Sequence, residues 1–344
     1  MKSRFILPLV AALIAVLCIS CKEKEEETKY MSFVGDPEFE LPTFIKAGDK
    51  HHLTPKTVKR SADDNSTLEP GCRWYLSDGS TPSDTVRWEG DPSYVPYDYD
   101  LTVPDSLESV TVTCCIFADG YTDKSFSCTA IVVRTDGPLP SLQGVNFPAG
   151  SGTFSDTRDN MIYHYITVDG TDWMAENLAW AGCGTSYLSA PLVDVFFGRY
   201  YTWTEASTAC PDGWTLPTNA DFLALNNAFV DKPTDNPYET FPVGAGHHMA
   251  NAYFNYQKLW EYWPDVTPVN TSGFSLLPVG YVIFSGEKKE LMDMMAYGMV
   301  WTGEQYGEKQ AYYRSVNMRY DKILIETGYR DNMAMSVRCV RKSD

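Results

Sequence analysis

The hydrophobic pattern over residues 36–136 has a period of two, which is the spacing of a β-strand with one buried face. In one run, Val110, Val112 and Ile116 fall on a single face while threonines point the other way. Clusters of turn-forming residues separate the runs, and no helical pattern of any length competes with them. We therefore predict a β-sandwich domain over residues 36–136, with strands at 38–45, 72–76, 109–117 and 125–133.

The side chains of this first domain suggest a known type of sandwich. Trp74 lies on a predicted strand, and this arrangement resembles the inner-strand tryptophan of immunoglobulin-like domains. The resemblance is generic and implies that the domain serves as a spacer. A hairpin about Tyr121 would place Cys114 opposite Cys128, on the same face as Cys72. These cysteines either form a bridge or remain reduced in the core.

A change of pattern marks the second domain. Proline and glycine cluster over residues 137–152, which predicts a linker before a domain at 153–344. Apolar residues at helical spacing predict one helix that ends at Cys210 and another that begins at Thr218, with Asp221 completing a capping box. Strands are predicted at 163–168 with a return from 173, and at 273–282, 299–302, 310–317 and 335–340. The chain is therefore expected to be mainly β, with an α+β C-terminal domain.

The first 21 residues predict a bacterial lipoprotein signal. Lys2 and Arg4 form a basic start, and the apolar run over residues 5–17 is too short to span a membrane. The segment ends in Leu-Cys-Ile-Ser-Cys, which resembles a lipobox with Cys21 as the lipidated residue. Lipidation at Cys21 would anchor the protein in the outer membrane. A plain signal peptide that happens to contain cysteines is the alternative.

An acidic tether over residues 22–35 is predicted to follow the signal. An acidic stretch directly after a lipidated cysteine resembles the export signal that sends Bacteroidetes lipoproteins to the outer leaflet of the outer membrane. A simple linker is the alternative. The chain has a formal net charge of −17 at pH 7, so we expect no nucleic-acid partner, because such binding depends on clustered Lys and Arg. We predict a lipid-anchored, surface-exposed protein of the cell outer membrane.

Five blocks of sequence in the second half carry a family resemblance, at residues 172–178, 198–222, 273–280, 301–304 and 336–341. In the same order they resemble the Fibrobacter succinogenes major paralogous domain, a family of bacterial surface domains related in architecture to C-type lectin-like domains. The resemblance covers residues 153–342. It implies a C-type lectin-like domain with two helices and a disulfide between Cys210 and Cys339. The Glu-Pro-Asn, Gln-Pro-Asp and Trp-Asn-Asp motifs of calcium-dependent lectins do not occur in the chain, so the resemblance does not extend to calcium-dependent sugar binding.

No catalytic motif accompanies the predicted fold. The sequence has no Gly-x-Ser-x-Gly elbow, no His-Glu-x-x-His and no glycine-rich phosphate loop. Formylglycine-generating enzymes share the fold and use reactive cysteines, but no Lys or His lies near Cys183, which is interpreted as an unpaired loop cysteine. The adjacent histidines at 51–52 and 247–248 are expected to be exposed rather than to chelate a metal. We expect no catalytic residue, no cofactor and no metal ligand.

The best candidate for ligand binding is the aromatic segment over residues 253–265. In C-type lectin-like folds this region forms the long loop that presents the ligand. The rings of Trp260, Tyr262 and Trp263 could stack on sugars, while Asp265 could accept hydrogen bonds from hydroxyls. The same rings could instead pack a long irregular loop onto the core. The sequence leaves both roles open.

These features predict a surface lipoprotein that presents its C-type lectin-like domain to an extracellular glycan or protein ligand, or that mediates adhesion. The alternative is a structural role, as an accessory or tip component of a surface filament or other protein assembly. An enzyme on a formylglycine-generating-enzyme-like fold ranks third. An exposed aromatic strip beside carboxylates would favour glycan binding, whereas a broad apolar patch would favour assembly.

Overall fold

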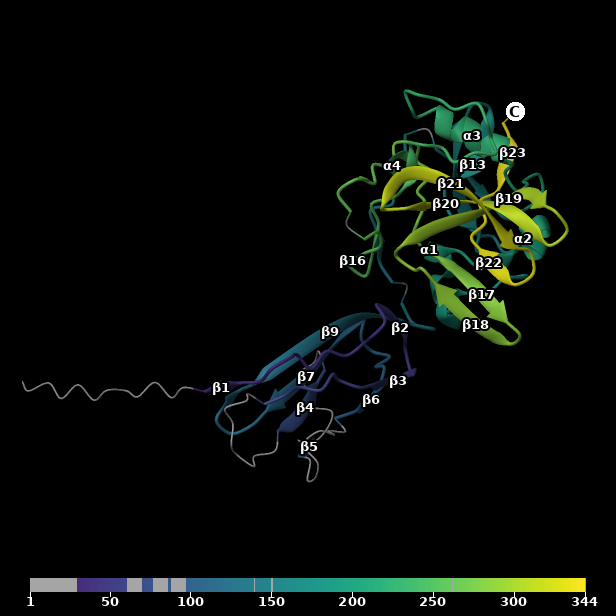
Figure 1. Ribbon diagram of the computed structural model, residues 1–344. Coiled ribbons are helices and arrows are strands. Elements are labelled where there is room, and N and C mark those ends of the chain that lie inside the picture. Colours follow the sequence, from purple (N-terminus) through teal and green to yellow (C-terminus); the bar gives the residue numbers. More distant parts are fainter. Residues whose placement is uncertain are drawn as a thin grey trace, which may run out of the picture.

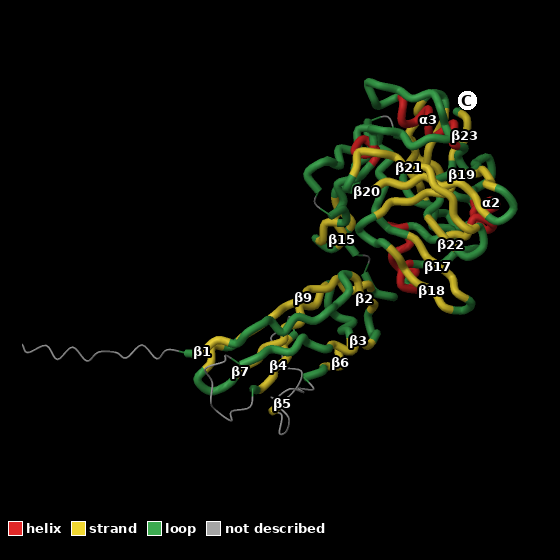
Figure 2. The backbone as a smooth tube through the Cα atoms, viewed as in Figure 1, coloured by secondary structure: helices red, strands yellow, loops and turns green. Residues whose placement is uncertain are grey.

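The computed structural model describes residues 30–60, 70–76, 86–87, 97–138, 140–149, 151–261 and 263–343. The protein is mainly β, with several small sheets. Figure 1 shows an elongated N-terminal part beside a rounder C-terminal part. Within the described segments the helices all belong to the C-terminal part, where Figure 2 draws them in red. The predicted signal peptide, including Cys21, lies outside the described residues.

The N-terminal part is built on a five-stranded sheet in the order β2-β9-β7-β4-β5. Its strands are β2 (Phe44–Lys46), β4 (Gly71–Tyr75), β5 (Val86–Arg87), β7 (Ser109–Phe117) and β9 (Lys124–Val133). Strand β2 runs parallel to β9, and the other pairs are antiparallel. Two further pairs are β3 (Lys50–Leu53) with β6 (Tyr99–Thr102) and β1 (Met31–Ser32) with β8 (Tyr121–Thr122). The predicted strands at 72–76, 109–117 and 125–133 are confirmed to within a residue, whereas 38–45 becomes a strand only at its end.

Trp74 lies in the N-terminal core, as its place on a predicted strand suggested. It is 2% exposed, and its indole N–H donates to the carbonyl of Tyr97 at 2.9 Å. The rings of Phe39 and Tyr99 pack against it, with centroids 5.0 and 5.3 Å away. The alternate valines of β7 are fully buried in the same cluster, so the period of two correctly identified the core face of this strand.

The β7–β9 hairpin differs from its predicted register by two residues. Cys128 pairs with Val112 instead of Cys114, so the predicted pairing is wrong. The register is centred on Gly120, whose φ of 80° permits a tight turn, rather than on Tyr121. Cys114 instead lies beside Cys72, with the two Sγ atoms 3.6 Å apart. Both are free thiols packed in the core.

Two four-stranded sheets and one three-stranded sheet frame the C-terminal part. Their strand orders are β11-β12-β13-β23, β14-β22-β17-β18 and β19-β20-β21. The strands of the first are β11 (Gly152–Ser155), β12 (Ile162–Val168), β13 (Thr171–Met174) and β23 (Val340–Lys342). Those of the second are β14 (Tyr201–Thr202), β22 (Met333–Met335), β17 (Tyr281–Ser285) and β18 (Lys288–Met292). The third contains β19 (Tyr297–Tyr306), β20 (Gln310–Asn317) and β21 (Tyr320–Tyr329). The first sheet brings the two ends of this part together.

The two predicted helices are confirmed. Helix α2 (Trp203–Ala209) has Cys210 as its C-cap residue. Helix α3 (Asn219–Asn227) begins with the predicted capping box, in which Thr218 and Asp221 exchange side-chain and backbone hydrogen bonds. Shorter helices are α1 (Asp194–Phe197), α4 (Ala245–His248) and 3₁₀ turns at Tyr187–Ser189 and Pro191–Val193.

Two predicted strands of the C-terminal part are shortened or broken. The run at 273–282 enters a sheet only at Tyr281, because Ser275 and Gly280 have φ values of 56° and 64°, which an extended strand cannot contain. The run at 335–340 is split between the end of β22 and the start of β23, since the intervening residues cross from one sheet to another. Both runs are buried, but neither forms a regular strand along its whole length.

The predicted linker is in part an ordered element of the C-terminal part. Strand β10 (Leu142–Gln143) pairs with β15 (Tyr253–Phe254), which in turn pairs with β16 (Gln257–Lys258). Further along, the ring of Phe147 stacks on His164 with centroids 3.9 Å apart. Residues 142–147 therefore pack against the C-terminal part and do not form a separate linker.

Phe44 connects the N-terminal part to the C-terminal part. It is 5% exposed, and its ring lies 5.9, 6.4 and 6.0 Å from those of Tyr187, Phe197 and Phe254. Val133 of β9 joins the same apolar cluster. The two parts therefore share a buried aromatic contact as well as the covalent connection.

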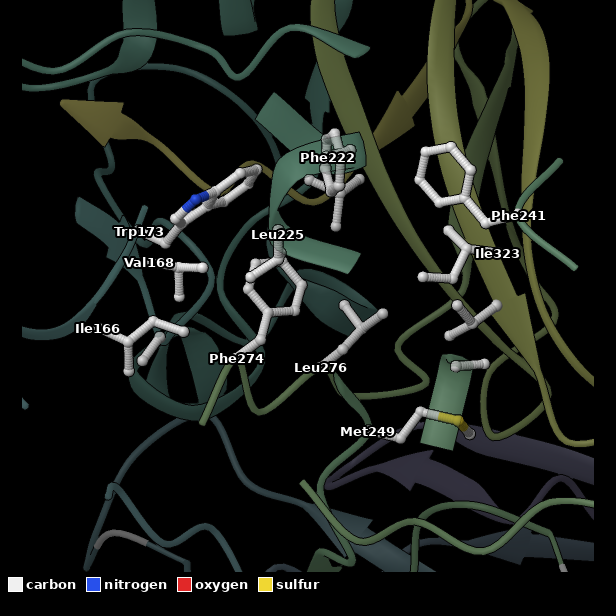
Figure 3. Packing of buried hydrophobic residues seen from close by; sticks show 14 of the residues in the cluster. Ile166, Val168, Trp173, Phe222, Leu225, Phe241, Met249, Phe274, Leu276 and Ile323 are labelled. Carbon is white, nitrogen blue, oxygen red and sulfur yellow. The ribbon is translucent and has the colours of Figure 1, made fainter. Parts of the chain in front are cut away.

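The main core of the C-terminal part lies between α3 and the third sheet. Figure 3 shows Trp173 and Phe274 close to Phe222 and Leu225 of α3, with Ile323 on the sheet side. The rings of Trp173 and Phe222 are 5.0 Å apart and meet edge to face, a favoured geometry for aromatic pairs. This core fixes the elements from which the surface loops project.

Candidate functional site

The disulfide between Cys210 and Cys339 holds the frame of the C-terminal part. Its two Cα atoms are 5.9 Å apart and are separated by 129 residues along the chain. Cys210 caps α2, whereas Cys339 immediately precedes β23. The bond expected from the family resemblance is confirmed, and it ties a helix to the end of the chain.

A buried cation joins three of the sequence blocks that carried the resemblance. Arg338 is fully buried, and its Nε donates to Asn177 Oδ1 at 2.7 Å. Its remaining hydrogen bonds go to the carbonyls of Met174, Phe274 and Ser275. Burial lowers the pKa of Arg338 to about 9. These blocks therefore build the scaffold of the C-terminal part.

The predicted binding segment at 253–265 is divided into buried and exposed residues. Trp260 is 1% exposed and belongs to the main core, so it packs the loop and offers no ring face to a ligand. Trp263 is 41% exposed. Tyr262 lies outside the described residues. Of the two roles that the sequence left open, the structure gives packing to Trp260 and leaves Trp263 available for binding.

Trp263 contacts one anionic and one cationic side chain. Its indole N–H donates to Asp265 Oδ2 at 3.3 Å, which fixes the orientation of the ring. The guanidinium carbon of Arg319 lies 5.9 Å from the ring centroid. Asp265 and Arg319 are themselves exposed, so both can also reach a ligand placed on the indole.

Arg319 comes from the turn between β20 and β21, far from Trp263 in the sequence. Tyr320, the first residue of β21, is exposed beside this turn, and Lys322 Nζ lies 5.7 Å from the centroid of its ring. We call Trp263, Asp265 and Arg319, together with Tyr320 and Lys322 that follow Arg319 in the chain, the tip cluster. The sequence predicted Trp263 and Asp265 as binding residues but not the other three. The sequence Arg-Tyr-Asp-Lys at 319–322 does not indicate which distant loop it contacts.

Asp321 of β21 forms hydrogen bonds to the start of α4 and so stabilises the adjacent turn. Its two carboxylate oxygens accept hydrogen bonds from the backbone N–H groups of Gly246 and Gly244, at 3.0 and 3.2 Å. The backbone N–H of Arg319 donates to Asn317 Oδ1 at 2.9 Å. The turn is therefore held on both sides, which limits the entropy that a ligand would have to remove.

The adjacent histidines of α4 have different environments. His247 is half-buried and its Nδ1 lies 2.6 Å from Thr271 Oγ1. His248 is only 2% exposed, so the expectation that both are exposed is wrong. Its ring nitrogens lie near Ser272 Oγ and Asn226 Oδ1, at 2.9 and 3.3 Å. Burial lowers the pKa of His248 to about 3, which keeps the ring neutral at physiological pH.

Among the described residues, the His, Cys and acidic side chains do not form a metal-binding group. No group of three or more His, Cys, Asp or Glu side chains gathers in this portion of the chain to hold an ion. Cys183 is half-buried, and burial raises the pKa of its thiol, which disfavours the reactive thiolate. In the same segments, none of the helices has the length and apolar character needed to cross a bilayer.

A cavity of about 280 Å³ opens beside the docked linker, with Glu176, Asn177 and Arg338 among its lining residues. Glu176 already accepts a hydrogen bond from the backbone N–H of His164 at 2.6 Å. Asn177 donates to the carbonyl of Phe197 at 2.8 Å and accepts from Arg338. Because these polar groups are engaged within the protein, the cavity is a weaker candidate for a ligand site than the exposed tip cluster.

Comparison with known families confirms the resemblance carried by the five sequence blocks. The chain matches the model of the Fibrobacter succinogenes major domain over residues 166–341. This match covers half of the chain, and the protein belongs to that family. The matched region contains the disulfide and the tip cluster. A search of curated proteins finds no match to the chain.

Proposed function

We propose that this protein is a lipid-anchored component of the bacterial outer membrane that presents its C-terminal domain to an extracellular glycan. The anchor is supported by the signal-like start, by the position of Cys21 in a lipobox-like sequence and by the acidic tether that follows it. The net charge of −17 leaves little attraction to anionic lipid, so the lipid itself would hold the protein at the membrane.

We infer an immunoglobulin-like sandwich for the first domain and a C-type lectin-like fold for the second. The buried Trp74 beside the central strands supports the first assignment. The link from the end of α2 to the residue preceding β23 supports the second, together with the long irregular segment that carries Trp263. In this arrangement the first domain spaces the second away from the membrane.

The observation that carries the proposal is the exposed indole of Trp263 between Asp265 and Arg319. The C–H faces of a sugar pack on aromatic rings, while carboxylate and guanidinium groups exchange hydrogen bonds with its hydroxyls. A ring that is 41% exposed contributes little to the core, yet its orientation is fixed by the bond to Asp265. Fixed orientation and open access are the properties that a stacking platform requires.

A glycan array tests this proposal with the mature chain lacking its lipid. We expect binding to a restricted set of glycans by the wild type, and loss of these signals in Trp263→Ala. Tyr30→Ala is the matched control, because Tyr30 is 58% exposed and lies in the N-terminal part. Absence of glycan signal from a folded wild type would refute glycan binding, and signals that Trp263→Ala leaves unchanged would refute this site.

A further inference from the structure

Three tyrosines of the third sheet and Tyr238 of a neighbouring loop form a second aromatic surface, apart from the residues of the tip cluster. Tyr238, Tyr306 and Tyr329 are 52%, 53% and 53% exposed, and Tyr312 is half-buried between them. The ring of Tyr312 lies 5.8 Å from that of Tyr238 and 5.3 Å from that of Tyr306. We call these four residues the tyrosine strip.

The strand register places the remaining ring on the same face. Tyr306 of β19 pairs with Gln310 of β20, and Gln310 pairs with Tyr329 of β21. Directly paired residues point to the same side of a sheet, and so does Tyr312, two positions after Gln310. The amide of Gln310 thus lies between two exposed rings and can exchange hydrogen bonds with a molecule that covers both.

The outer end of the strip is held by Glu304. Its Oε1 accepts a hydrogen bond from the hydroxyl of Tyr238 at 2.9 Å. Its Oε2 accepts from the backbone N–H and the side-chain amide of Asn219, at 2.7 and 2.6 Å. An exposed tyrosine is therefore tied through one carboxylate to the start of α3, which keeps its ring in a single position.

A buried arginine clamps the loop that carries Tyr238. Arg314 is 2% exposed, and it donates hydrogen bonds to the carbonyls of Pro237 and Glu239, on either side of Tyr238. Its Nε donates to Asn219 Oδ1 at 3.0 Å, and its guanidinium lies over Phe241. A buried cation that braces an exposed ring gives a preorganised surface, because little side-chain entropy remains to be lost on binding.

The geometry of the rings limits the kind of ligand. Tyr312 makes interplanar angles of 55° with Tyr238 and 65° with Tyr306, so the platform is turned rather than flat. A flat crystalline face could not contact all of these rings at once. A single flexible polymer whose successive units rotate could follow them, with each unit resting on one ring.

Charge and exposure further restrict the ligand. The carboxylate that holds Tyr238 and the chain's net charge of −17 disfavour an acidic polymer. Rings that are about half exposed form an open surface, which suits the middle of a long chain better than one terminal sugar. We propose that the tyrosine strip binds soluble, unbranched, neutral polysaccharide along its length, as a second site independent of the tip cluster.

Native affinity electrophoresis tests this proposal, with hydroxyethyl cellulose, xylan or glucomannan cast into the gel. We expect the mature wild-type chain to be retarded in at least one of these gels. Tyr306→Ala and Tyr329→Ala should each weaken the retardation about fivefold or more, whereas Tyr306→Phe, which keeps a ring, should retain most of it. Tyr30→Ala should be retarded like the wild type, since Tyr30 belongs to neither the strip nor the tip cluster.

The outcomes separate this proposal from the tip cluster. An unretarded wild type in all three gels would overturn the strip as a polysaccharide site. So would equal retardation of Tyr306→Ala, Tyr329→Ala and wild type, or binding to microcrystalline cellulose without retardation by the soluble polymers. Retardation lost only in Trp263→Ala would assign the polymer to the tip cluster instead. Retardation that depends on the strip, combined with no array signal that depends on Trp263, would support the tyrosine strip and refute the tip cluster as a glycan site.

Discussion

At the scale of single residues, two neighbouring tryptophans on one loop have opposite roles. Trp260 is 1% exposed and Trp263 is 41% exposed. Trp260→Ala should therefore open a cavity and lower the free energy of unfolding by about 3–5 kcal/mol, while Trp263→Ala should change it by less than about 1 kcal/mol. Thermal or urea unfolding of both variants measures the difference. Equal losses would mean that the loop is structural throughout.

His248 gives the C-terminal part a dependence on pH. Its folded pKa of about 3 lies below the ordinary value of 6.5, so below pH 6.5 the unfolded chain binds a proton that the folded chain does not. Stability contributed by the neutral ring is complete above pH 6.5 and falls as pH drops toward 3, by up to about 1.4 kcal/mol per pH unit. Urea unfolding between pH 7 and pH 4 should show this slope in the wild type and in His247→Gln. A folded His248→Asn variant with the same slope would contradict the assignment.

Sequence pattern alone could not identify the environment of such residues. Two adjacent histidines or two tryptophans three apart carry no signal of burial by themselves. Arg319 reaches Trp263 only through the fold, since one comes from a hairpin turn and the other from an irregular loop. The tyrosine strip is likewise assembled from three strands and a separate loop, so its members have no common spacing.

At the scale of elements, helices and strands whose sequence signals lie within a few neighbouring residues could be predicted. The capping box of α3 lies within four residues, and the alternation of β7 lies within a single strand, so these elements agree with prediction. The run at 273–282 could not be predicted, because hydrophobicity does not reveal the positive φ values at Ser275 and Gly280. Strand β21 was missed because its charged and apolar residues do not alternate, and many of its side chains are only half-buried.

The disulfide between α2 and the C-terminal end is the element-scale feature with the largest expected effect. Replacing Cys210 and Cys339 together by Ser should reduce the free energy of unfolding by roughly 3–5 kcal/mol, because the bond closes a loop of 129 residues. Urea unfolding measures this loss, and Cys183→Ser serves as the control because Cys183 is free. Peptide mapping under non-reducing conditions that found either thiol free in the exported protein would rule out the bond.

At the scale of the whole molecule, the anchor and the joint between the two parts determine how the binding surfaces are presented. Phe44 packs among three aromatic rings of the C-terminal part, so the two parts share an apolar contact. Cys21→Ser should release the protein from the membrane fraction into the soluble fraction, because a lipidated cysteine is the proposed attachment. Fatty-acid labelling that persisted in this variant would show that Cys21 is not the lipidated residue.

The central claim is that an extracellular glycan stacks on Trp263, and calorimetric titration with a glycan selected on the array tests it most directly. Trp263→Ala should lose about 1–3 kcal/mol of binding free energy, which is roughly a fivefold to 150-fold rise in Kd, with its melting temperature nearly unchanged. Trp263→Phe should fall between the wild type and Trp263→Ala because it retains a smaller ring. Equal Kd values for all three proteins, each folded, would contradict the account.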